Sequence, residues 1–211
     1  MPEISVELSD LQKSFGRRKV LSGVDLQIGG GEIVGIVGEN GAGKTTLLKI
    51  MVGLLRPDSG RMKIRGRTGY CPQDMLLFDN LTVDEHFRLF AAAYGLAGKH
   101  RRVDWERTQA DLQEMLNFSD YRDTLVSELS GGTKQKLNFS LSVLHQPDVF
   151  VLDEPYSALD WESYLSFWNF AARMKESNRT IILVSHIIFD RARLDRIFEL
   201  KKGRLNCTST E

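Results

Sequence analysis

The sequence lacks the features that mark secreted, membrane-spanning or strongly charged proteins. Its only cysteines are Cys71 and Cys207, too few for a disulfide framework or a four-thiolate zinc site. No apolar run reaches the roughly 18 residues of a membrane span, and the first residues lack the pattern of a signal peptide. Lys plus Arg and Asp plus Glu both number 28, so there is no net charge to attract nucleic acid. These absences favour a protein of the reducing cytosol.

The composition that remains is typical of one folded domain, with or without a modest insertion. Hydrophobic residues make up 42% and charged residues 27% of the 211 residues. Both fractions are close to those of average globular chains, which argues against disorder. A chain of this length buries a sizeable core without covalent cross-links.

Two kinds of strand are predicted from the hydrophobic pattern. Ile4–Leu8 and Val24–Ile28 alternate apolar and polar residues, which predicts strands with one exposed face. Other short segments are apolar on both faces and predict buried strands of a parallel sheet. These are Ile33–Val37, Val149–Leu152 and Thr180–Val184, and Ile197–Leu200 predicts a further short strand.

Five segments carry helix signals. Thr82 and Glu85 form a capping box at the start of one of them, and Gly95 follows its apolar stripe as a stop signal. The predicted helices are Thr45–Leu55, Thr82–Tyr94, Trp105–Leu116, Gly132–Leu144 and Glu162–Glu176. Three of them form a helical insertion over 74–145. The strand and helix alternation around it predicts an α/β core with a parallel sheet.

A glycine-rich loop between the strand Ile33–Val37 and the helix after it matches the pattern G-x-x-x-x-G-K-[ST]. Its residues are Gly38, Glu39, Asn40, Gly41, Ala42, Gly43, Lys44 and Thr45, and Thr46 follows in the helix. Glycines let successive backbone N–H groups turn inward around phosphate oxygens, and the helix directs its positive end at the anion. Lys44 would contact the β- and γ-phosphates, and the Thr45 hydroxyl would ligate Mg²⁺.

Two acids, Asp153 and Glu154, follow the apolar run Val149–Leu152. Acids at the carboxyl end of a parallel strand lie in the ligand crevice of such folds. Alone, they could be a solvated strand end. Beside a phosphate loop, Asp153 is a candidate for holding Mg²⁺ through water, and Glu154 is a candidate general base for an attacking water.

With Leu129–Gly132 between the phosphate loop and the two acids, the order of motifs resembles that of ATP-binding cassette (ABC) ATPases, the motor subunits of ABC transporters. The resemblance covers essentially the whole chain. It implies one domain over 1–211. A P-loop NTPase core with a mostly parallel sheet, together with an N-terminal antiparallel β subdomain, would occupy about 1–73 and 146–211. A helical (signature) subdomain would occupy 74–145.

The resemblance also assigns residues outside the phosphate loop. Gln73 is similar to the Q-loop glutamine that contacts Mg²⁺, and Asp160 ends a D-loop. His186 is similar to the switch histidine, and Phe15 to an aromatic that stacks on adenine. Each has an ordinary alternative when taken alone, such as a core position for Phe15.

The signature motif would be formed by Ser130, Gly131 and Gly132, which contact the γ-phosphate of ATP bound by a second subunit. The sequence departs from the family pattern here, because Thr133 stands where glutamine is usual. The change could alter the rate or mark a subunit that pairs with a different partner.

The resemblance implies a head-to-tail dimer that encloses two ATP molecules, with Mg²⁺, and opens after hydrolysis. Glu154 would activate water, His186 would orient the γ-phosphate, and Lys44 would bind it. The second ATPase subunit could be an identical or a different chain. Two-fold symmetry would make both sites equivalent in a homodimer.

A separate transmembrane subunit is the expected partner, which would place the chain in the cytoplasm, peripheral on the inner face of the membrane. The docking region would be Gln73–Leu81, in which Met75–Phe78 form either a docking surface or internal core. The stretch from Tyr70 through Leu96 resembles export-type cassettes of bacteria more than importer cassettes. The cargo is not indicated.

The alternative class is a soluble ABC ATPase that acts on ribosomes or DNA. Such proteins usually carry two cassettes or long coiled-coil insertions. The region 74–145 lacks heptads, and no basic stripe for nucleic acid is present, so no nucleic-acid partner is expected.

Overall fold

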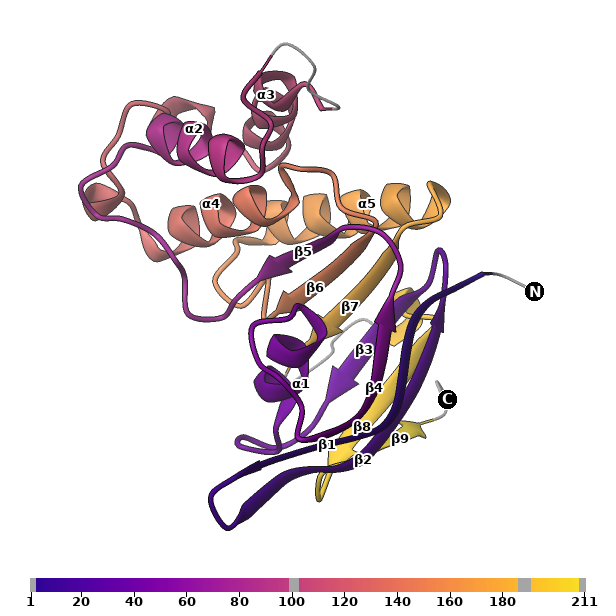
Figure 1. The fold of residues 1–211 in the computed structure, drawn as a ribbon. Coiled ribbons are helices and arrows are strands. Elements are labelled where there is room, and N and C mark those ends of the chain that lie inside the picture. Colours follow the sequence, from indigo (N-terminus) through magenta and orange to yellow (C-terminus); the bar gives the residue numbers. More distant parts are fainter. Residues whose placement is uncertain (1–2, 99–102, 186–190, 209–211) are drawn as a thin grey trace. The chain divides into compact units, whose positions relative to one another are not determined.

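The structure, a computed structural model, describes residues 3–98, 103–185 and 191–208. Its contacts divide the chain into two compact units. The first unit comprises 1–68, 148–154 and 171–211, and the second unit comprises 69–147 and 155–170. Figure 1 labels the helices and strands and colours them along the sequence. Each unit is described by itself.

An antiparallel sheet forms one part of the first unit, with strand order β2-β1-β4. Its strands are β1 (Ile4–Phe15), β2 (Arg18–Gly29) and β4 (Ser59–Ile64). β1 and β2 form a long hairpin that contains both predicted alternating strands. The apolar positions of that alternation, such as Val6, Leu8 and Leu26, are buried, which explains why one face of the hairpin packs inward.

The other sheet of the first unit is mostly parallel. Its strands run in the order β6 (Val149–Asp153), β7 (Thr180–Val184), β3 (Ile33–Val37), β8 (Arg196–Lys201) and β9 (Arg204–Thr208). The first four strands are mutually parallel, and β9 pairs antiparallel with β8. Every residue of β6 and β7 is buried, as their two-faced apolar runs predicted. The predicted α/β fold class is therefore confirmed.

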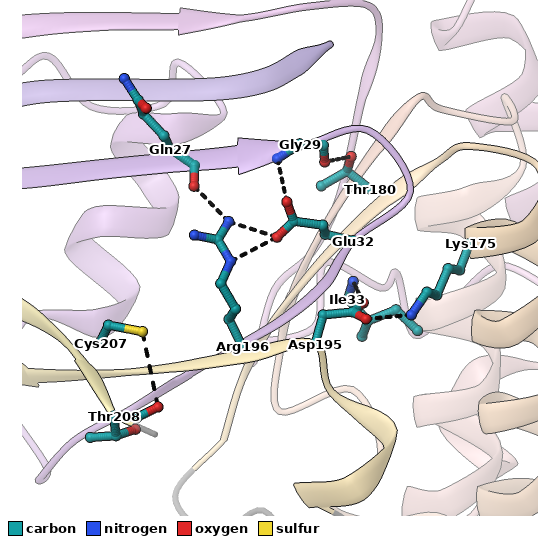
Figure 2. Close-up of polar contacts among 10 residues, drawn as sticks. All are labelled: Gln27, Gly29, Glu32, Ile33, Lys175, Thr180, Asp195, Arg196, Cys207 and Thr208. Atoms are coloured by element: carbon teal, nitrogen blue, oxygen red, sulfur yellow. Dashed lines mark hydrogen bonds and ion pairs between the residues drawn. The ribbon is translucent and has the colours of Figure 1, made fainter. Parts of the chain in front are cut away.

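Polar contacts fix the start of β3, the strand that leads into the phosphate loop. Arg196 at the start of β8 donates to Glu32 Oε2 (2.8 Å) and to the carbonyl of Gln27 (2.6 Å). Asp195 Oδ2 accepts the N–H of Ile33 at 2.8 Å. Figure 2 shows these side chains converging between β8 and the end of β2. They hold the turn from the antiparallel sheet to β3 in place.

Helix α1 (Lys44–Met51) is shorter than the predicted helix Thr45–Leu55. The N–H groups of Gly53 and Leu54 bond back to the carbonyls of Ile50 and Lys49, at 2.9 and 2.8 Å. This pair of bonds is a Schellman motif, which satisfies the last carbonyls and ends the helix. The prediction was wrong because it placed the stop at Pro57 and not at the glycine.

The second unit is mainly helical. It contains α2 (Val83–Ala93), α3 (Trp105–Met115), α4 (Gly131–Val143) and the first part of α5 (Trp161–Glu176). These four helices confirm the predicted ones to within two residues at each end. The short strand β5 (Thr68–Cys71) was not predicted. Each helix in the described part of the chain is too short or too polar to span a bilayer.

A buried carboxylate joins three segments of the second unit. Asp84 on α2 is only 6% exposed and accepts hydrogen bonds from Gln109 of α3 (3.1 Å) and from Arg122 (2.9 Å). Arg88 Nη2 lies 2.8 Å from its other oxygen. Burial raises the pKa of the Asp84 carboxyl, but the bonds from Gln109 and Arg122 and the charges of both arginines outweigh it, so that the pKa is lowered. Asp84 is thus held as an anion that fixes α2 to α3.

Candidate functional site

The phosphate loop connects β3 to α1, as its sequence predicted. The Lys44 ammonium donates to the carbonyls of Gly38 (2.6 Å) and Glu39 (3.0 Å), so its side chain folds back across the loop. Burial lowers the pKa of Lys44, and the nearby charges of Glu154 and Asp153 oppose that shift. The loop therefore surrounds a buried cation at the start of a helix.

Backbone geometry keeps the start of α1 open to an anion. Within the described residues, no side chain caps this helix, and its first turn contains no acid. The first N–H groups of a helix lack intrahelical partners and carry partial positive charge. Gly38 packs so closely that a Cβ atom there would lie 2.5 Å from the carbonyl oxygen of Leu200. A side chain at this position would displace the loop.

Thr45 and Asp153 meet at the base of the loop. The Thr45 hydroxyl donates to Asp153 Oδ2 at 2.8 Å, and Asp153 is 1% exposed at the end of β6. A hydroxyl and a carboxylate oxygen are the hard ligands that Mg²⁺ prefers. No cluster of three or more His, Cys, Asp or Glu side chains suited to a metal occurs in the described part of the chain. The pair fits an ion whose other ligands are phosphate oxygens and water.

Glu154 lies directly after Asp153 in a left-handed backbone conformation, with φ of 52°. Its N–H bonds to the carbonyl of Val184 at 2.9 Å, and the Ser185 hydroxyl donates to its Oε2 at 3.1 Å. The Glu154 side chain is thus aimed by a residue at the end of β7. The sequence analysis missed Ser185, although its position directly before His186 was an available signal. His186 itself lies outside the described residues.

Phe15 ends β1 at the tip of the hairpin, where it pairs with Arg18. It is 51% exposed, so the alternative of a core position is wrong. Arg18 Nη2 donates to the carbonyl of Gly41 at 2.9 Å, which ties the hairpin tip to the phosphate loop. Arg18 is a second residue that the sequence analysis missed. The first unit thus brings together Phe15, the phosphate loop and the two acids.

The signature residues lie at the start of α4 in the second unit. Ser130 is the N-cap: its hydroxyl oxygen accepts the N–H of Thr133 at 3.2 Å and lies 2.9 Å from the Thr133 hydroxyl. Thr133 is 7% exposed. A Cβ atom on Gly132 would approach the carbonyl oxygen of Ala158 to 2.9 Å, whereas one on Gly131 would meet nothing within 4 Å. The backbone N–H and the hydroxyl of Thr133 therefore both hold the Ser130 side chain at the start of α4.

Asp160 caps the start of α5 in the second unit. Its carboxylate accepts the N–H of Ser163 at 2.8 Å and pairs with Lys136 of α4 at 2.9 Å. The hydrogen bond from Lys136, with those from Ser163, lowers the pKa of Asp160 to about 2. Gln73 is exposed in the segment that follows β5. The structure accordingly gives Asp160 local partners, while Gln73 stays a prediction.

An exposed apolar groove of about 500 Å³ lies in the second unit. Its lining residues are Leu77, Phe78, Asp79, Asn80, Leu81 and Leu89. Leu76 beside it is 68% exposed and Phe78 is 55% exposed, so the alternative that Met75–Phe78 form internal core is wrong for these two residues. Several large apolar side chains at one solvent-facing site are typical of a protein interaction surface.

Known proteins are similar to this chain in both sequence and fold. A family model described as ABC transporter matches residues 21–157. The chain is 35% identical over 206 residues to an uncharacterized ABC transporter ATP-binding protein of Methanocaldococcus jannaschii, covering 96% of this chain and 76% of that protein. It is 37% identical over 186 residues to a probable metal transport system ATP-binding protein of Thermotoga maritima, covering 87% and 75%.

A solved structure of an ATP binding subunit of an ABC transporter is also similar. It matches with a TM-score of 0.88 and 28% sequence identity, and the alignment covers 97% of this chain and 89% of that chain. The family model, the relatives and the solved structure agree with one another.

Proposed function

The chain belongs to the ABC transporter family, and on that premise we propose that it hydrolyses ATP to drive transport through a separate membrane subunit. The main support for this proposal is the hydrogen bond between Thr45 and Asp153, next to the Lys44 side chain that folds back across the loop. These groups provide a phosphate-binding cation and two hard oxygen ligands in one place.

ATP binding begins with the phosphate loop. Lys44 exchanges its two carbonyl contacts for oxygens of the β- and γ-phosphates, and the first N–H groups of α1 bind the same anion. Thr45 and Asp153 would hold Mg²⁺, which neutralises charge on the phosphates. The exposed ring of Phe15 is available to stack on the adenine base.

Hydrolysis depends on the positioning of a water molecule and on stabilisation of charge more than on covalent catalysis by the protein. Glu154, oriented by Ser185, accepts a proton from water while the water oxygen forms a bond to the γ-phosphorus. The bond from that phosphorus to the β–γ bridging oxygen breaks, and ADP and phosphate result. His186 orients the γ-phosphate in this proposal, by resemblance to the family.

Two subunits enclose the nucleotide in the proposed active form. Ser130, Gly131 and Gly132 of one subunit face the ATP bound by the phosphate loop of the other. The N-terminus of α4, which these residues begin, adds its positive partial charge. Hydrolysis removes the γ-phosphate contacts, so the dimer opens.

The groove lined by 77–81 and Leu89 is the proposed docking site for the membrane subunit. Its exposed leucine and phenylalanine side chains suit an apolar segment of the partner. Asp79 pairs with Lys134 at 3.9 Å but stays 74% exposed, so it suits an additional basic side chain. Docking would hold the chain at the cytoplasmic face of the membrane. The Thermotoga relative is named for metal transport. For this chain we propose that the membrane subunit, and not the ATP-binding subunit, binds the cargo.

The alternative of an ABC ATPase that acts on ribosomes or DNA is not favoured. The relatives are named as ABC transporter and transport system ATP-binding proteins. The chain also has equal numbers of acidic and basic residues, which gives no general attraction to nucleic acid.

The proposal is tested by purification of the tagged chain from its native cells in mild detergent. We expect a polytopic membrane protein to co-purify; recovery of ribosomes or DNA in its place would overturn the assignment to transport. The Lys44→Ala variant tests the nucleotide site separately, by titration with ATP. We expect its ATP affinity to fall at least about tenfold, because a charged hydrogen-bond donor is lost. Unchanged affinity would contradict the role of the phosphate loop.

A further inference from the structure

A buried histidine holds Phe78, one of the residues that line the docking groove. His86 on α2 is 0% exposed, and its Nε2 accepts the N–H of Phe78 at 2.9 Å. A backbone amide can only donate, so Nε2 must carry a lone pair and the ring proton must lie on Nδ1. Nδ1 lies 2.8 Å from the carbonyl of Thr82 and donates to it. The two bonds together define one tautomer of the imidazole.

The same histidine also contacts the Phe78 side chain. The two rings are stacked, with centroids 5.9 Å apart and an interplanar angle of 29°. Phe78 is nevertheless 55% exposed and lines the groove. His86 therefore fixes both the backbone and the ring of a residue that faces solvent.

Other bonds fix the neighbours of Phe78. The N–H of Ser127 donates to the carbonyl of Asp79 at 3.2 Å, and the N–H of Val126 donates to that of Leu81 at 3.0 Å. Both donors belong to the short helix η2 (Val126–Glu128). These bonds place the end of the segment 77–81, whereas His86 places Phe78 itself.

We propose that His86 is a positioning residue for the docking groove: as the Nδ1–H tautomer it presets Phe78 for an apolar segment of the membrane subunit. The inference rests on the proposed function, because it takes that subunit as the occupant. Leu77, Phe78 and Leu89 suit apolar partners, and Asp79, which pairs with Lys134 at 3.9 Å but keeps 74% of its side chain exposed, suits an additional basic one. A groove ordered in advance loses less conformational entropy on binding.

The first test uses the unaltered protein. NMR of the ¹⁵N-labelled imidazole of His86 reports which nitrogen carries the proton. We expect protonated Nδ1 and unprotonated Nε2 in the full chain. The opposite tautomer would overturn the inference, since Nε2 could not then accept the Phe78 N–H.

The second test separates the two hydrogen bonds by substitution. In His86→Gln the side-chain carbonyl reaches as far as Nε2 and can accept from Phe78. In His86→Asn the shorter amide can donate only toward Thr82. We expect the Phe78 amide to exchange with solvent about tenfold faster in the Asn variant and near the parent rate in the Gln variant. Equal rates in the two variants would contradict the positioning role.

The third test measures binding of the membrane protein recovered by co-purification, reconstituted in lipid nanodiscs. We expect affinity to fall about tenfold for His86→Asn and to be restored in His86→Gln, with thermal unfolding of both variants as the control for folding. Equal affinity of the parent and the Asn variant would overturn this inference and leave the proposed function intact. Failure to recover any membrane partner would overturn both.

Discussion

The Thr45 hydroxyl donates to the Asp153 carboxylate over 2.8 Å, although 108 positions separate the two residues in the chain. The contact joins the first turn of α1 to the carboxyl end of β6. Asp153 is nearly inaccessible to solvent, so its position is set before any ligand arrives. Two oxygen ligands suited to Mg²⁺ are thereby brought together within one unit.

Removal of the Thr45 hydroxyl tests this pair. Thr45→Val keeps the shape of the side chain but leaves the buried Asp153 carboxylate without that donor. We expect the free energy of unfolding to fall by about 1–3 kcal/mol and the Mg²⁺ dependence of ATP binding to weaken. Urea unfolding and calorimetric titration measure these effects. Thr45→Ser keeps the hydroxyl and serves as the control; a loss in the Ser variant equal to that in the Val variant would contradict the argument.

Glu154→Gln tests the assignment of the general base. The amide is close in shape to the carboxylate but cannot accept a proton from water. We expect ATP to bind as before and steady-state hydrolysis to slow by about 10²–10⁴-fold. Phosphate release at saturating ATP is the measurement. Hydrolysis at the parent rate would assign water activation to another group.

Gly131 and Gly132 give a matched pair of alanine substitutions. Gly132→Ala places a Cβ atom 2.9 Å from the Ala158 carbonyl, and we expect a loss of about 1–3 kcal/mol in the free energy of unfolding. Gly131→Ala meets nothing within 4 Å and lies in a helix, so we expect it to stabilise the fold by up to about 1 kcal/mol. Thermal and urea unfolding distinguish the two, and equal stability would refute the steric argument.

Asp160 makes acid stability depend on its ion pair with Lys136. Its pKa is lowered from 3.8 to about 2 in the fold, so its contribution is complete above pH 3.8 and is lost as the pH falls toward 2. Asp160→Asn retains an N-cap oxygen for Ser163 but not the charge. We expect the stability difference between parent and Asn variant to shrink as urea unfolding is repeated from about pH 6 down to about pH 3. A constant difference would exclude the ion pair.

Much of the candidate site could be predicted because its signals are local. The phosphate loop, the capping box at Thr82 and the acids after an apolar run are each short segments whose spacing carries the chemistry. Two exposed strands, β4 and β9, were not predicted, because none of their residues is buried and they form by pairing with β1 and β8. Such strands depend on neighbours more than on intrinsic preference.

The sequence by itself determined the chemistry of the chain: which residues can bind phosphate, ligate a metal or accept a proton, and in what order they occur. Only the tertiary structure decided which of them meet. It exposed the Phe15 ring, hydrogen-bonded Glu154 to Ser185 and brought His86 into hydrogen-bond contact with the Phe78 backbone. The physical reason is that hydrogen bonds and burial depend on distance in space. Residues far apart in the chain are brought together only when sheets and helices pack.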